Sequence, residues 1–188
     1  MSDTAFNAGQ FSDAILETIE FRGERTLVID PAKAFDFLKH CRDGLGYDYL
    51  IDISSVDNFG QDPRWEMVYE LYALADGSQQ HLRVKFAVPE DEKVPSVVDL
   101  WPTANWHERE VYDMMGIEFS DHPDLRRILM WEGYPFFPLR KDFPLAGRAS
   151  DMPDVAFTDK APLEGGPFVT QPTTASTSHR EPRSRAID

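Results

Sequence analysis

The apolar and polar positions at the start of the chain predict a short helix followed by a strand. Residues 1–11 form a polar leader. Ser12 can accept hydrogen bonds from the free N–H groups at a helix start. Three apolar residues then fall along one helical edge: Ile15, Leu16 and Ile19. Residues 26–29 combine threonine, leucine, valine and isoleucine, which favour a strand.

A second helix is predicted from Asp30-Pro31 to Gly44. Aspartate accepts hydrogen bonds at a helix start, and proline at the first helical position loses nothing by lacking an N–H. Gly44 suits a left-handed helix cap. The buried stripe of this helix is predicted to be Phe35, Leu38 and Cys41, with Ala34 and Phe37 beside it.

The middle of the chain reads as a meander of three antiparallel strands. The strand-like runs cover residues 47–56, 65–75 and 81–88, in which β-favouring residues alternate with charged ones. The intervening segments, 57–63 and 76–78, are rich in Asp, Asn, Gly and Pro and indicate turns.

Two more helices are predicted after the meander. Pro95 opens a short helix that reaches Leu100, and a second helix covers residues 105–115 and ends at Gly116. The fold class is therefore α+β, with an antiparallel or mixed sheet flanked by helices in a compact domain at 12–119.

The chain changes character beyond residue 119. Residues 120–145 are rich in proline and aromatic residues, which excludes a regular helix or a central strand and predicts an extended C-terminal arm. Residues 146–188 are polar and rich in Pro, Thr and Ser. This tail cannot bury enough apolar surface to order itself, so we expect it to be extended or ordered by a partner.

Composition narrows the classes of function. The net charge of −14 disfavours binding to nucleic acid, because phosphate would repel the chain. The single cysteine, Cys41, excludes a disulfide framework and a cysteine-rich zinc or iron–sulfur site within the chain. No apolar run approaches a bilayer span, and the N-terminus lacks the layout of a signal peptide. We expect a protein that stays in the cytoplasm.

Acidic residues and histidines gather around the last predicted helix, but their spacing does not favour a metal site. The HExxH pattern of zinc hydrolases would need a histidine at Val111. Arg109 and Asp113 are four residues apart and can pair on the helix surface. Glycine-rich nucleotide-binding loops are also missing from the sequence. The weighed metal-ligand candidates are His107, Glu108, Glu110, Asp113 and His122.

The predicted arm combines basic and aromatic residues, a mixture typical of protein interfaces. We interpret it as an interface strip; the alternative is that its aromatic rings fold back to cover the sheet. The predicted interface residues are Arg109, Asp113, His122, Arg126, Arg127, Trp131, Arg140, Lys141 and Phe143.

The stretch from Glu108 to Leu145 resembles a known family. The sequences EREVYDMMGIEF (108–119), HPDLRRILM (122–130), WEGYP (131–135) and PLRKDFPL (138–145) resemble the thirty-kilodalton-type subunit of respiratory complex I, the proton-pumping NADH:quinone oxidoreductase. Upstream, the chain resembles the family in layout only. Met115 stands where an aromatic residue is common in the family. Nothing after Leu145 resembles the forty-nine-kilodalton-type subunit, so we expect the unfused form.

The resemblance implies a non-catalytic structural subunit of the hydrophilic arm of the complex. It implies packing against the forty-nine-kilodalton-type subunit and neighbouring iron–sulfur subunits, on the cytoplasmic face of the bacterial inner membrane, with membrane association only through the complex. No cofactor is expected on this chain; NADH, FMN, iron–sulfur clusters and quinone belong to other subunits.

Two alternatives remain open. The first is the equivalent subunit of a sister complex, such as a membrane-bound hydrogenase or a dehydrogenase with another electron donor. The second is a free-standing metal-dependent hydrolase built on His107, Glu110 and His122.

Overall fold

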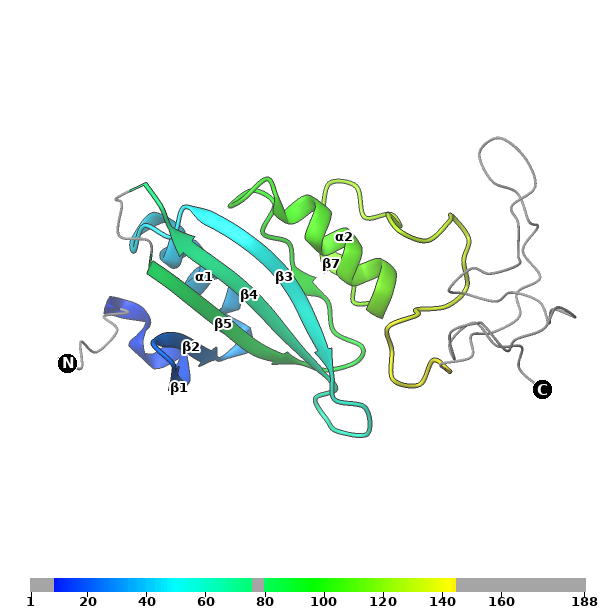
Figure 1. Cartoon of the computed structure of the whole chain (residues 1–188), viewed down its shortest axis with the longest axis horizontal. Helices are drawn as coiled ribbons and strands as arrows, with labels where there is room; N and C mark the ends of the chain where they lie inside the picture. Colours follow the sequence, from blue (N-terminus) through cyan, green and yellow to red (C-terminus); the bar gives the residue numbers. More distant parts are fainter. Residues whose placement is uncertain (1–8, 76–79, 145–188) are drawn as a thin grey trace, which may run out of the picture.

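A five-stranded mixed sheet organises the molecule. The computed structural model describes residues 9–75 and 80–144. The sheet has the order β1-β2-β5-β4-β3, in which the β2–β5 pair is parallel and the other pairs are antiparallel (Figure 1). Its strands are β1 (Ile15–Phe21), β2 (Glu24–Ile29), β3 (Tyr49–Asp57), β4 (Trp65–Ala73) and β5 (Gln80–Val88). The predicted meander is confirmed as β3, β4 and β5.

Two helices cover one face of this sheet. Helix α1 (Ala34–Asp43) follows the short 3-10 turn η2 (Pro31–Lys33), and helix α2 (Ala104–Met115) lies beside β3 (Figure 1). Buried residues of both helices belong to the same core as those of the strands. The α+β fold class is therefore confirmed. None of the helices in the described ranges has the length and hydrophobicity needed to cross a bilayer.

The two faces of the sheet differ in chemistry. On the covered face, Trp65, Met67 and Tyr69 of β4 are buried. On the other face, Glu66 pairs with Lys85 at 2.7 Å. A large apolar side chain contributes about 1.5–3 kcal/mol when buried, whereas an exposed ion pair contributes about 0–1 kcal/mol, so the core carries most of the stability.

The predicted first helix is wrong. Residues 15–21 form the edge strand β1, preceded by the 3-10 segment η1 (Gly9–Ala14). Arg22 and Gly23 both have positive φ and turn the chain into β2, so β1 and β2 form a hairpin. The apolar residues of this segment would also suit one edge of a helix. Pairing with β2 therefore decides that residues 15–21 form a strand.

The second predicted helix is confirmed, but two of its details are wrong. Asp30 accepts a hydrogen bond from the Ala32 N–H, as expected of a cap. Gly44, however, has φ −102, and the left-handed φ occurs at Gly46. Phe37 is fully buried and Phe35 only half-buried, because the helix turns the former toward the sheet.

The predicted short helix at 95–100 is also wrong. Val94–Pro95 is strand β6, which pairs in parallel with β7 (Phe119–Ser120). The N–H groups of Val94 and Ser96 donate to the carbonyls of Glu118 and Ser120. These long-range bonds hold residues 94–96 extended, and only turn bonds to the Val97 carbonyl follow at Leu100 and Trp101.

Helix α2 ends as predicted, at Gly116 with φ 77. We use "the arm" below for residues 120–144, the described part of the predicted 120–145 segment. After β7 the arm contains no helix or strand, as expected. The predicted hairpin turn at 76–78 and the tail at 146–188 lie outside the described residues.

Candidate functional site

The arm is attached to α2 through a single buried carboxylate, that of Asp113. Its Oδ2 accepts hydrogen bonds from the backbone N–H groups of three consecutive arm residues: Ile128 at 3.0 Å, Leu129 at 2.7 Å and Met130 at 2.8 Å. Arg127 donates to Oδ1 of the same carboxylate and to the Asp113 carbonyl. This arrangement is called the Asp113 anchor below.

The Asp113 anchor holds its carboxyl group in the charged form. Burial alone would raise the pKa of Asp113, but the N–H donors from Met130, Leu129 and Ile128 and the Arg127 guanidinium outweigh it, so the pKa lies below its usual value. A buried carboxylate with four donors has its hydrogen-bonding capacity satisfied, so these donors offset the cost of removing the charge from water.

Arg109 is a second link between α2 and the arm. Its guanidinium donates to the carbonyls of Arg126 and Arg127, both at 3.1 Å, and lies over the Trp106 ring. The expected pairing of Arg109 with Asp113 is therefore wrong. Backbone carbonyls of the arm attract Arg109, while Arg127 reaches Asp113 from the arm.

Arg64 ties the far end of the arm to the sheet. Its guanidinium binds Asp57 at 2.8 and 2.9 Å, Glu90 at 2.7 Å and Asp142 at 3.1 Å. Asp57 also accepts from the Lys141 N–H. Hydrogen bonds from Arg64 lower the pKa of Asp57, and those bonds in turn raise the pKa of Arg64. This arrangement is called the Arg64 cluster.

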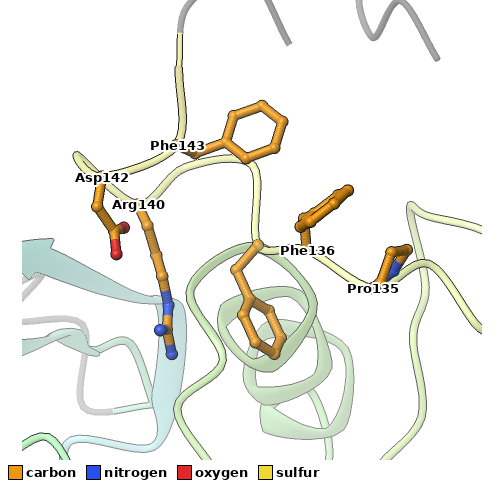
Figure 2. Close-up of a pocket in the computed structure, with 6 residues that line it drawn as sticks. Pro135, Phe136, Arg140, Asp142 and Phe143 are labelled. Atoms are coloured by element: carbon orange, nitrogen blue, oxygen red, sulfur yellow. The ribbon is translucent and has the colours of Figure 1, made fainter. Parts of the chain in front are cut away.

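Arg140 fills the space between the arm and the end of α2. It donates to the carbonyl of Met115 and lies over the rings of Trp65 and Phe137. Burial lowers the pKa of Arg140. In Figure 2, its side chain extends from the arm toward the sheet and the helix.

These contacts divide the predicted interface residues into two groups. Asp113, Arg109, Arg127 and Arg140 use their charged groups for contacts within the chain, which hold the arm on the domain. Of the other predicted residues, Arg126, Trp131 and Lys141 are exposed, whereas His122 and Phe143 are half-buried. Leu129 and Leu139, which were not predicted, are also exposed on the arm.

An aromatic hollow lies next to this exposed side. It has a volume of about 250 Å³ and is bordered by Phe136, Phe143 and Pro135 (Figure 2). Rings of Trp131, Tyr134 and Phe136 contact one another in succession, with centroids 4.5 and 5.6 Å apart. The exposed Trp131 ring is therefore supported by the buried Tyr134 ring, which in turn contacts Phe136 beside the hollow.

The histidines and acids of the weighed metal set are distributed among different partners. His107 lies 3.1 Å from Asp52 of β3, whereas His122 faces Glu108. Within residues 9–75 and 80–144, no group of three or more His, Cys, Asp or Glu side chains is arranged to hold a metal ion. Burial raises the pKa of the Cys41 thiol, which leaves it a poor nucleophile.

Sequence reasoning did not select the Arg64 cluster. Asp57, Arg64 and Glu90 lie far from the arm in sequence, and each reads as an ordinary loop charge. The signal that was present is an arginine directly before the buried Trp65, at the start of a strand, and it is a weak one.

The residues of this site lie within a region of the chain that is similar to a known protein family. Residues 27–149 match the family model described as "Respiratory-chain NADH dehydrogenase, 30 Kd subunit". The matched range contains β3, β4, β5, α2 and the arm. The chain belongs to this family.

Relatives of this complex I family member are named as C-type subunits of NADH-quinone oxidoreductase. The chain is 41% identical over 172 residues to the second C-type subunit of NADH-quinone oxidoreductase from Rhizobium meliloti (strain 1021), covering 89% of this chain and 88% of the relative. It is 44% identical over 139 residues to the C-type subunit from Geotalea uraniireducens (strain Rf4), covering 73% and 84%. The resemblance seen in the sequence is thus confirmed.

A solved structure shares the fold of this complex I family member. It belongs to the membrane-bound sulfane sulfur reductase, described as an archaeal respiratory membrane complex. The TM-score is 0.60 at 25% identity, over 68% of this chain and 76% of the other.

Proposed function

We propose that this complex I family member is a structural subunit of the peripheral arm of an NADH-quinone oxidoreductase and contains no catalytic centre. The proposal is supported by how the arm is attached to the domain and by which of its residues are exposed. Arg127 and Arg140 hold the arm on the domain. Its residues Leu129, Trp131 and Leu139 are exposed. Such a surface is suited to binding another protein rather than to transforming a small molecule.

The proposed partners are the forty-nine-kilodalton-type subunit and the neighbouring iron–sulfur subunits. Leu129, Trp131 and Leu139 would form the apolar centre of the contact, and Arg126 and Lys141 its charged rim. NADH, FMN, iron–sulfur clusters and quinone belong to other subunits in this proposal. The chain then lies on the cytoplasmic face of the bacterial inner membrane and reaches the membrane only through its complex.

The equivalent role in a sister complex is the second candidate. The likeness to a subunit of a sulfane sulfur reductase complex supports it, but at 25% identity against 41–44% for the subunits named as NADH-quinone oxidoreductase. Purifying the intact complex through a tag on this chain and assaying NADH oxidation separates the two. A complex without NADH activity would favour the sister role.

A pair of matched substitutions tests the proposed surface. Leu129 is 61% exposed on the arm, and Leu16 is 66% exposed on β1, away from the arm (Figure 1). Leu129→Ser removes apolar area from the proposed contact, so we expect the amount of this chain recovered in the native complex to fall by roughly tenfold, as for a central interface residue. Leu16→Ser makes the same chemical change elsewhere.

Both variants should retain the unfolding midpoint of the wild type, because each side chain lies outside the core. Native gel electrophoresis of membranes reports assembly. Equal assembly of the Leu129→Ser and Leu16→Ser variants would exclude the arm as the contact surface.

A further inference from the structure

The side chain of Glu108 is buried at the point where α2, the segment before α2 and the start of the arm meet. It has no exposed surface. One oxygen, Oε1, accepts a hydrogen bond from the Val97 N–H at 2.7 Å. The other, Oε2, has no hydrogen-bond partner among the described residues. A charged carboxylate with a bare buried oxygen would be strongly disfavoured.

The imidazole of His122, at the start of the arm, faces this bare oxygen. Its Nε2 lies 3.9 Å from Oε2, beyond hydrogen-bond distance. The Asp124 N–H donates to Nδ1 of the same ring, so Nδ1 carries no proton. Nε2 then holds the ring's single proton and points it at the Asn105 carbonyl, 3.3 Å away. His122 is therefore neutral and supplies no positive charge to Glu108.

The other neighbours do not compensate a charge on Glu108 either. Tyr69 of β4 is fully buried, its hydroxyl has no hydrogen-bond partner in the described part of the chain, and its interaction with Glu108 helps to raise its pKa. Arg109, next in sequence, donates to arm carbonyls instead. Burial raises the pKa of Glu108 to about 7, against the opposing effect of the Val97 N–H and the Ser96 hydroxyl.

From this geometry we infer that Glu108 is a buried neutral acid, and that its ionisation loosens the first residues of the arm. An ionised Glu108 needs a further donor for Oε2, and the Nε2–H of His122, 3.9 Å away, is one that the arm can supply. To donate its Nε2–H to Glu108, the His122 ring must turn away from the Asn105 carbonyl. To become a cation, the ring must take up a proton on Nδ1, which then can no longer accept the hydrogen bond from the Asp124 N–H. The first change breaks the contact of His122 with Asn105, which holds the start of the arm on the domain, and the second breaks the local turn between His122 and Asp124.

The direction of the pH dependence follows from the two protonation states. The closed arm keeps the proton on Glu108 up to about pH 7, whereas an exposed glutamate releases it near pH 4.3. Rising pH therefore favours the open arm, and the opening constant should increase about tenfold between pH 6 and pH 8. Burial also lowers the pKa of His122, so below about pH 6.5 a rise in pH favours the closed arm through this ring. Because this effect opposes that of Glu108, the test compares the wild type with a variant.

The test uses the full chain and two measurements. The ¹³C shift of the Glu108 carboxyl, followed by NMR, should titrate with a midpoint near 7. Hydrogen exchange of a peptide covering residues 121–131, corrected for the intrinsic exchange rate, should show about tenfold lower protection at pH 8 than at pH 6. A peptide from β4 serves as the internal reference.

Glu108→Gln keeps an acceptor for the Val97 N–H but cannot ionise, so the tenfold loss of protection should disappear. Glu110→Gln is the matched control, because Glu110 is exposed on the same helix, and it should behave like the wild type. A carboxyl midpoint below about 5.5, or an undiminished pH effect in the Glu108→Gln variant, would overturn the inference. The expected midpoint together with loss of the effect supports it.

Discussion

Asp113 shows how a residue's role depends on what surrounds it. By spacing alone it reads as one half of a surface ion pair, worth about 0.2–0.5 kcal/mol. In the structure it is fully buried and accepts three backbone hydrogen bonds and one from Arg127. Hydrogen bonds to charged groups contribute about 1.5–3 kcal/mol each, so this single carboxylate accounts for much of the attachment of the arm.

Asp113→Asn tests this attachment. The amide replaces one carboxylate oxygen by a donor, which leaves either Arg127 or the N–H groups of residues 128–130 without an acceptor. We expect hydrogen-exchange protection of residues 128–130 to fall at least about tenfold, while that of the sheet is retained. Glu110→Gln, exposed on the same helix, should leave both unchanged.

The same carboxylate predicts how acid affects the wild type. Because the pKa of Asp113 is lowered in the folded chain, its contribution is complete above the ordinary value of about 3.9 and is lost as the pH falls through the lowered one. Protection of residues 128–130 should therefore decline below about pH 4. If the Asp113→Asn variant lost protection over the same acid range by the same factor, another group would be responsible.

At the scale of elements, the end of α2 decides where the arm lies. Gly116 adopts φ 77, which ends the helix, and the Met115 carbonyl left free there accepts from Arg140. A Cβ atom on Gly116 would lie 2.6 Å from Nη2 of Arg140 and 2.7 Å from the Phe137 ring. The helix end is thus both a backbone turn and a packing surface for the arm.

Gly116→Ala should destabilise the chain more than an alanine at a comparable turn. Gly60 has φ 85 and open space around its Cβ position, so Gly60→Ala measures backbone strain alone, about 1 kcal/mol. Gly116→Ala adds the displacement of Phe137 and Arg140, about 1–3 kcal/mol more. Urea unfolding of both variants gives the comparison. Equal losses would mean that the arm does not pack on Gly116 in solution.

At the scale of the whole molecule, the arm is fastened near its middle and at its far end. The Asp113 anchor holds its middle on α2, and the Arg64 cluster joins residue 142 to the ends of β3 and β5. Between these points Trp131 and Leu139 are exposed, together with the charged residues Glu132 and Lys141. The arm continues the chain beyond the end of α2 (Figure 1). A preorganised surface loses less entropy on binding, which suits a subunit that must join a large complex.

Arg64→Lys tests the far attachment. A lysine ammonium keeps the charge but cannot match the two-oxygen contact with Asp57 while also reaching Glu90 and Asp142. We expect a loss of about 1.5–3 kcal/mol in the free energy of unfolding, because the Arg64 side chain is only 7% exposed. Arg25→Lys alters the exposed pair with Glu20 and should cost at most about 1 kcal/mol. Similar losses for both would rule out a special role for Arg64.

The sequence by itself determined the elements whose signals are local. Alternating β-favouring residues specified β4 and β5, Asp30-Pro31 specified the start of the second helix, and Gly116 the end of α2. The run from 108 to 145 was sufficient to identify the family, and its prolines excluded regular structure in the arm. Each of these signals acts within a few residues along the chain.

Tertiary structure alone decided which charged groups meet. Residues 15–21 became a strand because β2 lay beside them, and residues 94–95 paired with β7 instead of starting a helix. Asp113 pairs with Arg127 instead of Arg109. Arg64 binds Glu90 and Asp142, which are 26 and 78 positions away from it in the sequence. Such partners are distant in sequence, and burial strengthens their interactions well beyond those of surface neighbours. Spacing along the chain therefore could not reveal that most of the predicted interface cations hold the arm in place.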